Sequence, residues 1–146
     1  MATITKFEDL EIWKLARELN KEVFPILEIL NEKHNYKLKE QLDGSAGSVM
    51  DNISEGFERD GNREFIQFLA ISKGSLGEVR SQLYRVLDRQ VIDKVKFESL
   101  NETCLTLANK IGKFMTYLNN SNIKGKKFVK PNIIVSYSNR TETKNN

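Results

Sequence analysis

The chain has 146 residues, among them 23 Lys+Arg, 20 Asp+Glu, one His and one Cys. This length favours a single domain, and one Cys excludes both an internal disulfide framework and a cysteine-based zinc site. No run reaches the roughly 18 apolar residues of a membrane span, and the acidic start has no apolar segment typical of a secretory signal. We therefore expect a helical, cytoplasmic protein without a membrane partner.

Charge is distributed unevenly along the chain. Residues 1–119 hold 17 Lys+Arg against 19 Asp+Glu, a balance of −2, whereas residues 120–146 hold 6 against 1, a balance of +5. We interpret residues 1–119 as the folded domain and residues 120–146 as a basic, flexible tail. The tail is either a solvated extension or an arm for nucleic acid or an acidic partner, and its stretch 128–137 could dock on a neighbouring subunit.

The first helix is predicted over residues 7–31. Thr5 and Glu8 have the spacing of a capping box, in which each side chain satisfies backbone donors at a helix start. Apolar residues recur at helical spacing on both sides of Pro25. We therefore expect this proline to kink the helix without ending it.

The second helix is predicted over residues 38–56, after a polar link that holds the only His, His34. Five consecutive small residues, at positions 44–48, have poor helix propensity as a set. Close approach of another helix is the expected compensation. Gly56 is placed to end the helix as a left-handed cap.

The last two helices are predicted over residues 63–88 and 94–119, with Asn62 and Asp93 as N-caps. Each has a regular line of core positions along one side, which we call its seam. Their core positions alternate in steps of three and four residues, the spacing of helices that pack nearly parallel or antiparallel. The seam positions are Phe65, Leu69, Ser72, Leu76, Val79, Leu83 and Val86 in one helix, and Phe97, Leu100, Cys104, Leu107, Ile111, Phe114 and Leu118 in the other. The predicted fold class is all-α, an up-down antiparallel four-helix bundle.

The residue inventory argues against catalysis. His34 lies in a polar link without the walled pocket that a catalytic base needs, and Cys104 lies on an apolar seam, where burial raises the pKa of a thiol. A di-iron centre in a bundle needs two Glu-x-x-His motifs, and the glycines match neither phosphate-loop nor dinucleotide-binding spacing. We predict no enzyme activity, no catalytic residue, no cofactor and no metal.

Polar residues gather around the turn after the second helix, at Asn52, Glu55, Arg59, Arg63 and Glu64. The functional interpretation is a ligand or conformational site. The structural interpretation is that Glu55 and Arg59 form an ion pair while Asn52 and Glu64 satisfy helix ends. We favour the structural interpretation because the turn needs such partners in either case.

A basic stripe is the second surface feature. Lys73 and Arg80 are seven residues apart beside the third-helix seam, and Tyr84 follows one turn later. Such a stripe suits phosphate backbones. Glu78 and Asp88 lie on the same helix, so a charge-balanced, solvated face is the alternative.

The motifs, taken in order, resemble those of a known family. They are Phe7-x-Asp9-Leu10-x-Ile12-Trp13-x-x-Ala16, Gln41-Leu42, Asn52-Ile53-Ser54-Glu55-Gly56, Arg59, Glu64-Phe65-Ile66-Gln67-Phe68-Leu69, Ser72-x-Gly74-Ser75-Leu76-x-Glu78 and Gln82-Leu83. Together they resemble the four-helix bundle family first named for proteins encoded in intervening sequences of bacterial 23S rRNA genes. The resemblance covers residues 7–118.

The resemblance implies a homopentameric, barrel-like ring. A related branch of the family, the accessory variability protein of diversity-generating retroelements, binds nucleic acid and a reverse transcriptase. Many relatives carry two basic residues after Gln-Leu, where this chain has Asp43-Gly44, and Ile-Pro before Asn-Ile, where it has Val49-Met50-Asp51. The missing positive charges weaken nucleic-acid binding by the second helix and shift the expected contact towards the tail.

The functional hypothesis is a non-enzymatic, homo-oligomeric adaptor that binds RNA or DNA. The candidate contact residues are Lys73, Arg80, Lys124, Lys126, Lys127 and Lys130. The alternative is a structural module that docks a partner protein without nucleic acid. Nucleic-acid binding would weaken steeply with salt because it releases counterions, whereas protein docking would rest on apolar contact and depend weakly on salt.

Overall fold

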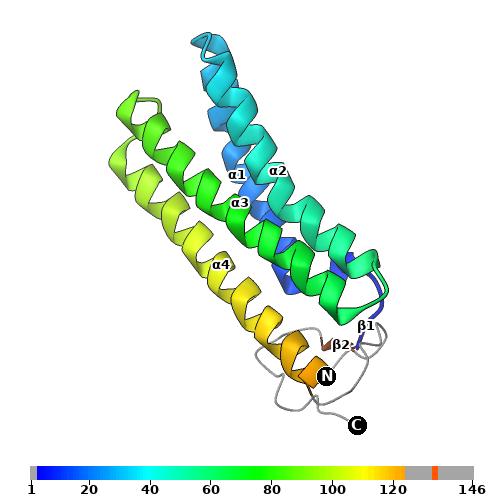
Figure 1. Ribbon diagram of the computed structural model, residues 1–146. Helices are drawn as coiled ribbons and strands as arrows, with labels where there is room; N and C mark the ends of the chain where they lie inside the picture. The colour runs from blue at the N-terminus through cyan, green and yellow to red at the C-terminus, as the bar shows by residue number, and fades with distance from the viewer. Residues whose placement is uncertain (1–2, 124–132, 135–146) are drawn as a thin grey trace.

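The computed structural model describes residues 3–123 and 133–134, and it confirms the predicted antiparallel four-helix bundle (Figure 1). The helices are α1 (Glu11–Glu32), α2 (Tyr36–Glu58), α3 (Asn62–Asp88) and α4 (Lys94–Ile123). Each helix contacts the next one in the chain, and α1 also contacts α4. In Figure 1 the α1–α2 and α3–α4 links lie at one end of the bundle, and the α2–α3 link lies at the other. Within the described residues, none of the helices has the length and apolarity to cross a membrane.

The two predicted seams form the centre of the core. Every seam residue on α3 and α4 is at most 6% exposed. Ser72 is the one hydroxyl among them, and its Oγ donates a hydrogen bond to the Val49 carbonyl of α2 at 2.7 Å. This bond explains how a polar side chain occupies a core position, because buried polar groups need a partner.

The predicted capping box of Thr5 and Glu8 is wrong, because a short 3-10 helix, η1 (Phe7–Asp9), comes before α1. Leu10 separates the two with an extended backbone (ψ 129°), and no side chain caps the start of α1. Leu10 is only 2% exposed. The break therefore places an apolar side chain in the core, which stabilises the fold more than one cap bond would.

The α1–α2 link is shorter than the sequence predicts. As expected, α1 continues through Pro25, and it ends only at Glu32. His34 adopts φ 62° in the link, a left-handed conformation that reverses the chain within three residues. Its ring nitrogen Nδ1 lies 2.6 Å from the exposed Tyr36 hydroxyl.

Gly56 does not cap α2, contrary to prediction, because the helix continues past it to Glu58. A Cβ atom placed on Gly56 would lie 2.8 Å from Phe65 Cδ1 and 2.9 Å from Phe68 Cβ. The glycine therefore permits close packing of α3 against α2. Its role is steric and not conformational.

The small residues at positions 44–48 fulfil the prediction of close approach only in part. The Ala46 carbonyl accepts a hydrogen bond from the Asn20 amide of α1 at 2.8 Å, and Ser48 Oγ lies 2.8 Å from Ser75 Oγ of α3. A Cβ on Gly44 or Gly47, in contrast, would meet no atom within 4 Å. These two glycines face open space in the single chain.

The starts of α3 and α4 differ from each other. Asp93 caps α4 as predicted, because its Oδ1 accepts a bond from the Lys96 backbone amide at 2.8 Å. Asn62 is the first residue of α3 instead of its cap. It is 3% exposed, and its amide donates to the Leu118 carbonyl of α4 at 3.3 Å. Asn62 thus joins the start of α3 to α4.

The two ends of the described chain meet beside the α2–α3 link (Figure 1). The last helix, α4, runs beyond the predicted end at Asn119, to Ile123. Strand β1 (Thr3–Ile4) then pairs antiparallel with β2 (Ile133–Ile134), and Ile4 is fully buried. Part of the apolar stretch in the tail therefore pairs with the N-terminal end of its own chain.

Cys104 is fully buried on the α4 seam. Burial raises the pKa of its thiol from 9.0 to about 12, and this effect outweighs the opposing charge of Arg80. A thiol with such a pKa is protonated at neutral pH and is a poor nucleophile. Cys104 therefore acts as a small apolar core residue.

We predict opposite effects for alanine at two glycines of α2. Gly56→Ala should lower the free energy of unfolding by about 1–3 kcal/mol, because the new methyl overlaps Phe65 and Phe68. Gly47→Ala should raise it by about 0.5–1 kcal/mol, because alanine favours the helix and the space is open. Urea denaturation of both variants measures the difference. Equal effects would contradict the close α2–α3 contact.

We also predict that Cys104 reacts slowly with a thiol reagent at pH 8. The rise in pKa from 9.0 to about 12 lowers its thiolate fraction on the order of 1,000-fold relative to the unfolded chain. The folded state also holds this proton more tightly, so the free energy of unfolding should fall as pH rises above about 9. Cys104→Ala should make that fall shallower. Rapid labelling of a chain that circular dichroism shows to be folded would contradict the burial.

Candidate nucleic-acid interface

The polar cluster predicted near the α2–α3 turn is a surface ion-pair group. Arg59 Nη2 and Nε lie 2.9 Å and 3.2 Å from Glu55 Oε2, and Arg59 Nη1 lies 4.0 Å from Glu64 Oε2. The guanidinium carbon of Arg59 also lies 5.0 Å from the centre of the Phe68 ring. About half of each charged side chain is exposed, so these pairs contribute at most about 1 kcal/mol each.

Asn52 does not belong to this group. Its amide donates to the carbonyl and to Oγ of Ser48, one turn earlier in α2, both at 2.9 Å. Because Ser48 also contacts Ser75 of α3, Asn52 extends a polar contact between the two helices. The predicted cluster therefore separates into a turn part and an interhelical part. Neither part resembles a catalytic arrangement of acid, base and nucleophile.

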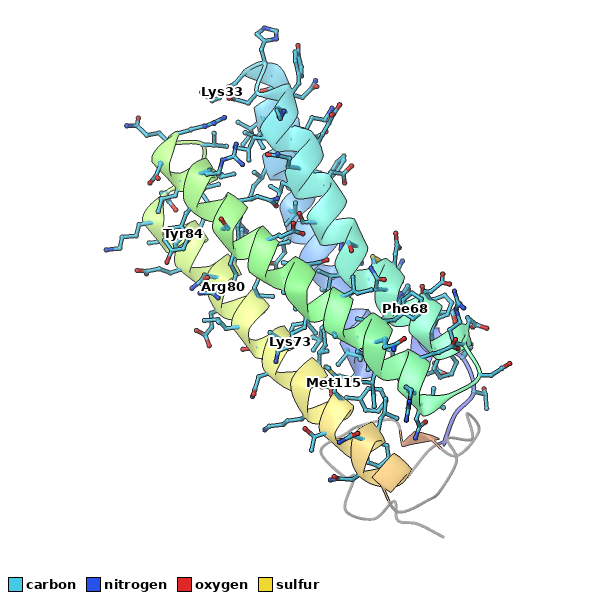
Figure 2. The ribbon with its side chains drawn as sticks, in the orientation of Figure 1. Lys33, Phe68, Lys73, Arg80, Tyr84 and Met115 are labelled. Carbon is cyan, nitrogen blue, oxygen red and sulfur yellow. The ribbon has the colours of Figure 1, made fainter. Side chains whose placement is uncertain are left out.

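A second surface, which we name the α3–α4 face, consists of two rows of residues that face each other. Both rows advance in steps of four and three residues, so each stays on one side of its helix. The α3 row is Ile66, Ala70, Lys73, Gly77, Arg80 and Tyr84, and the α4 row is Asn101, Leu105, Ala108, Gly112, Met115 and Asn119. Figure 2 labels Lys73, Arg80, Tyr84 and Met115 along this face.

Both predicted basic residues of the body lie on the α3–α4 face. Arg80 Nε donates to Asn101 Oδ1 at 2.8 Å, which holds the guanidinium across the groove between the helices. The side chain of Lys73 also reaches across to α4, because its Nζ lies 3.5 Å from the position that a Cβ on Gly112 would take. Two cations seven residues apart on one helix are separated by about 10 Å along the axis.

Tyr84 lies one turn beyond Arg80 on the same row. Its ring centre is 4.6 Å from that of Phe97 on α4, with the planes tilted by 54°. Phe97 is buried, but Tyr84 remains 49% exposed. One side of the tyrosine ring is thus supported by the core while much of the ring remains open to a ligand.

The electrostatics of the α3–α4 face favour anions over the part nearer the α2–α3 link. Residues 65–77 of α3 and 103–123 of α4 contain no Asp or Glu, whereas they contain Lys73, Lys110 and Lys113. Lys110 pairs with Glu11 of α1 at 3.4 Å. Among the described residues, Lys73, Arg80 and Lys113 have no ion pair. Carboxylates follow at Glu78, between Lys73 and Arg80 in α3, and near the other end at Asp88, Glu98 and Glu102.

The structure thus brings together only part of the predicted nucleic-acid contacts. The predicted tail residues Lys124, Lys126, Lys127 and Lys130 lie outside the described residues. Sequence reasoning missed Asn101 and Gly112. The repeat of steps four and three on the outer side of α4 was a usable signal, but the stronger apolar seam on the same helix concealed it.

The groups that usually bind metals are dispersed. Within residues 3–123 and 133–134, no three His, Cys, Asp or Glu side chains come together as a possible metal site. His34 is at the exposed α1–α2 link, whereas Cys104 is in the core.

Comparisons with known proteins agree with the sequence resemblance and the observed fold. Residues 8–113, more than half of the chain, match the family described as 23S rRNA-intervening sequence protein. A similar solved structure is a protein of unknown function from the S23 ribosomal protein family of Bacteroides thetaiotaomicron, with 19% identity and a TM-score of 0.67. The match covers 71% of this chain and 97% of that one, and it supports the fold alone. The comparison with curated proteins finds no match. The family match over residues 8–113 shows that this chain belongs to the 23S rRNA-intervening sequence proteins.

Proposed function

We propose that the protein is a non-enzymatic, homo-oligomeric adaptor of the cytoplasm that binds nucleic acid through the α3–α4 face. The observation that carries the proposal is the charge of this face. Lys73 and Arg80 have no ion pair among the described residues, and residues 65–77 of α3 and 103–123 of α4 contain no carboxylate, although Glu78 lies between the two cations in sequence. Cations that are not neutralised within the protein are free to replace counterions along a phosphate backbone.

The shape of the face supports the same proposal. Gly77 leaves the backbone of α3 bare between Lys73 and Arg80, because a Cβ on Gly77 would meet no atom within 4 Å. A phosphate backbone could therefore approach α3 closely between Lys73 and Arg80. The buried thiol of Cys104 and the exposed imidazole of His34 support a role without catalysis.

Homo-oligomerisation is the second part of the proposal. Gly44 and Gly74 lie in helix interiors, where each costs about 1 kcal/mol relative to alanine. Within the chain nothing lies within 4 Å of the positions their Cβ atoms would take. A second copy packing on these outer surfaces would offset the cost, and the homopentamer implied by the family resemblance supplies such a neighbour.

The nucleic-acid proposal predicts steep salt dependence. We expect labelled RNA and DNA to bind the full chain at low salt and to dissociate as salt rises, in a fluorescence anisotropy titration. Lys73→Gln with Arg80→Gln should reduce the slope of log K against log salt by about 2, roughly 1 per lost phosphate contact. The matched control, Lys33→Gln with Lys37→Gln, removes two exposed lysines that lie at the α1–α2 link, outside the α3–α4 face, and should leave the slope unchanged.

A third variant, in which Lys124, Lys126, Lys127 and Lys130 are all changed to Gln, tests the tail. It is preferable to truncation after Asn119, because α4 continues to Ile123 and Ile133–Ile134 pair with β1. Loss of binding in this variant alone would move the contact from the α3–α4 face to the tail. Absence of binding by the full chain at low salt would reject the proposal and favour the partner-docking alternative.

The oligomer prediction is tested by light scattering. The chain has a mass of 16.9 kDa, and we expect a mass close to that of a homopentamer. Gly74→Leu should reduce that mass without loss of helical content, because the new side chain occupies open space in the single chain. A full chain that runs as a monomer at micromolar concentration would contradict this part of the proposal.

A further inference from the structure

We propose that the α3–α4 face selects single-stranded nucleic acid and that Tyr84 stacks on an unpaired base. This inference rests on the proposed function, because it names the class of nucleic acid bound at the same face. The inference is based on the order of residues along the α3 row, in which the cations Lys73 and Arg80 are followed by the exposed ring of Tyr84.

The spacing of the row suits a strand that runs along α3. Arg80 and Tyr84 are four residues apart, and side chains at this spacing are neighbours on a helix surface. Lys73 lies two turns away from Arg80 in the opposite direction, with Gly77 between them. A strand whose phosphates contact Lys73 and Arg80 therefore brings its next base to the Tyr84 ring.

The ring is held in a way that favours stacking over simple burial. Phe97 supports it from the α4 side at 4.6 Å between ring centres, and 49% of Tyr84 remains exposed. A supported aromatic ring beside a cationic path is the arrangement by which proteins hold single strands without reading their sequence. A duplex offers no such base, because its base faces are already stacked within the helix.

The position of the two cations gives the strand a direction. Lys73 and Arg80 both lie on the α2–α3 link side of Tyr84, and neither has an ion pair among the described residues. Phosphates are attracted to these cations. The strand is therefore expected to extend from Tyr84 towards Lys73.

The test compares three kinds of oligonucleotide of equal length on the full chain, by anisotropy at one low salt concentration. They are an oligoadenylate, as RNA and as DNA, the matched abasic strand, which keeps the phosphates and lacks the bases, and a duplex. Tyr84→Leu should weaken oligoadenylate binding about 5-fold to 100-fold, the usual contribution of one aromatic–base stack. Binding of the abasic strand should not change, because it has nothing to stack.

Two variants control for other causes. Tyr84→Phe keeps the ring and should bind as the unchanged protein does, whereas Tyr36→Leu removes a tyrosine of similar exposure (50%) that lies at the α1–α2 link, outside the α3–α4 face, and should have no effect. Circular dichroism checks that Tyr84→Leu is folded, which we expect because leucine preserves an apolar contact with Phe97.

Two results would overturn the inference while leaving the proposed function in place. They are a duplex bound at least as tightly as the single strand, and equal loss of oligoadenylate and abasic binding in Tyr84→Leu. If the unchanged full chain binds none of the three oligonucleotides, the proposed function itself is rejected.

Discussion

The burial of one apolar seam per helix is the constraint on which the rest of the molecule depends. On α3 and α4 the seam repeats every seven residues, and every seam position is buried. A seven-residue repeat keeps two helices in register along their length, so residues beside the seam also form rows. The row from Ile66 to Tyr84 and the row from Asn101 to Asn119 therefore face each other as a consequence of core packing. The candidate binding face needs no dedicated element of its own.

The two sides of α3 are built from different chemistry. Towards α2 the contacts are short and involve small groups, with the Gly56 backbone against Phe65 and hydrogen bonds from Ser72 and Ser75. Towards α4 the outer contacts involve long cationic side chains, such as Arg80 on Asn101. A larger side chain would clash on the side of α3 that faces α2, whereas charged residues on the side that faces α4 can change without disturbing the core. The fold and the surface charge of this bundle are thus largely independent of each other.

Much of the fold could be predicted because periodicity reports burial directly. The seams, the four helices and the cap at Asp93 follow from spacing, since each depends on residues close in sequence. The roles of Gly56 and Asn62 could not be predicted, because they depend on contacts with Phe65 and Leu118 that only the folded chain provides. The capping-box prediction failed because local spacing competes with the burial of Leu10. For the candidate face, sequence pointed to Lys73, Arg80 and Tyr84 but not to Asn101 and Gly112, which lie on another helix.

The pairing of Thr3–Ile4 with Ile133–Ile134 has a consequence for the order of folding. Joining residues some 130 positions apart in an unfolded chain costs on the order of 4 kcal/mol in loop entropy. Two paired residues on each strand cannot offset this cost, because each hydrogen bond contributes about 1 kcal/mol net. The pair forms only after the helices, whose contacts are local and fast to form, have brought the two ends of the chain together. It is therefore the last contact to form in folding and the first to be lost when the bundle loosens.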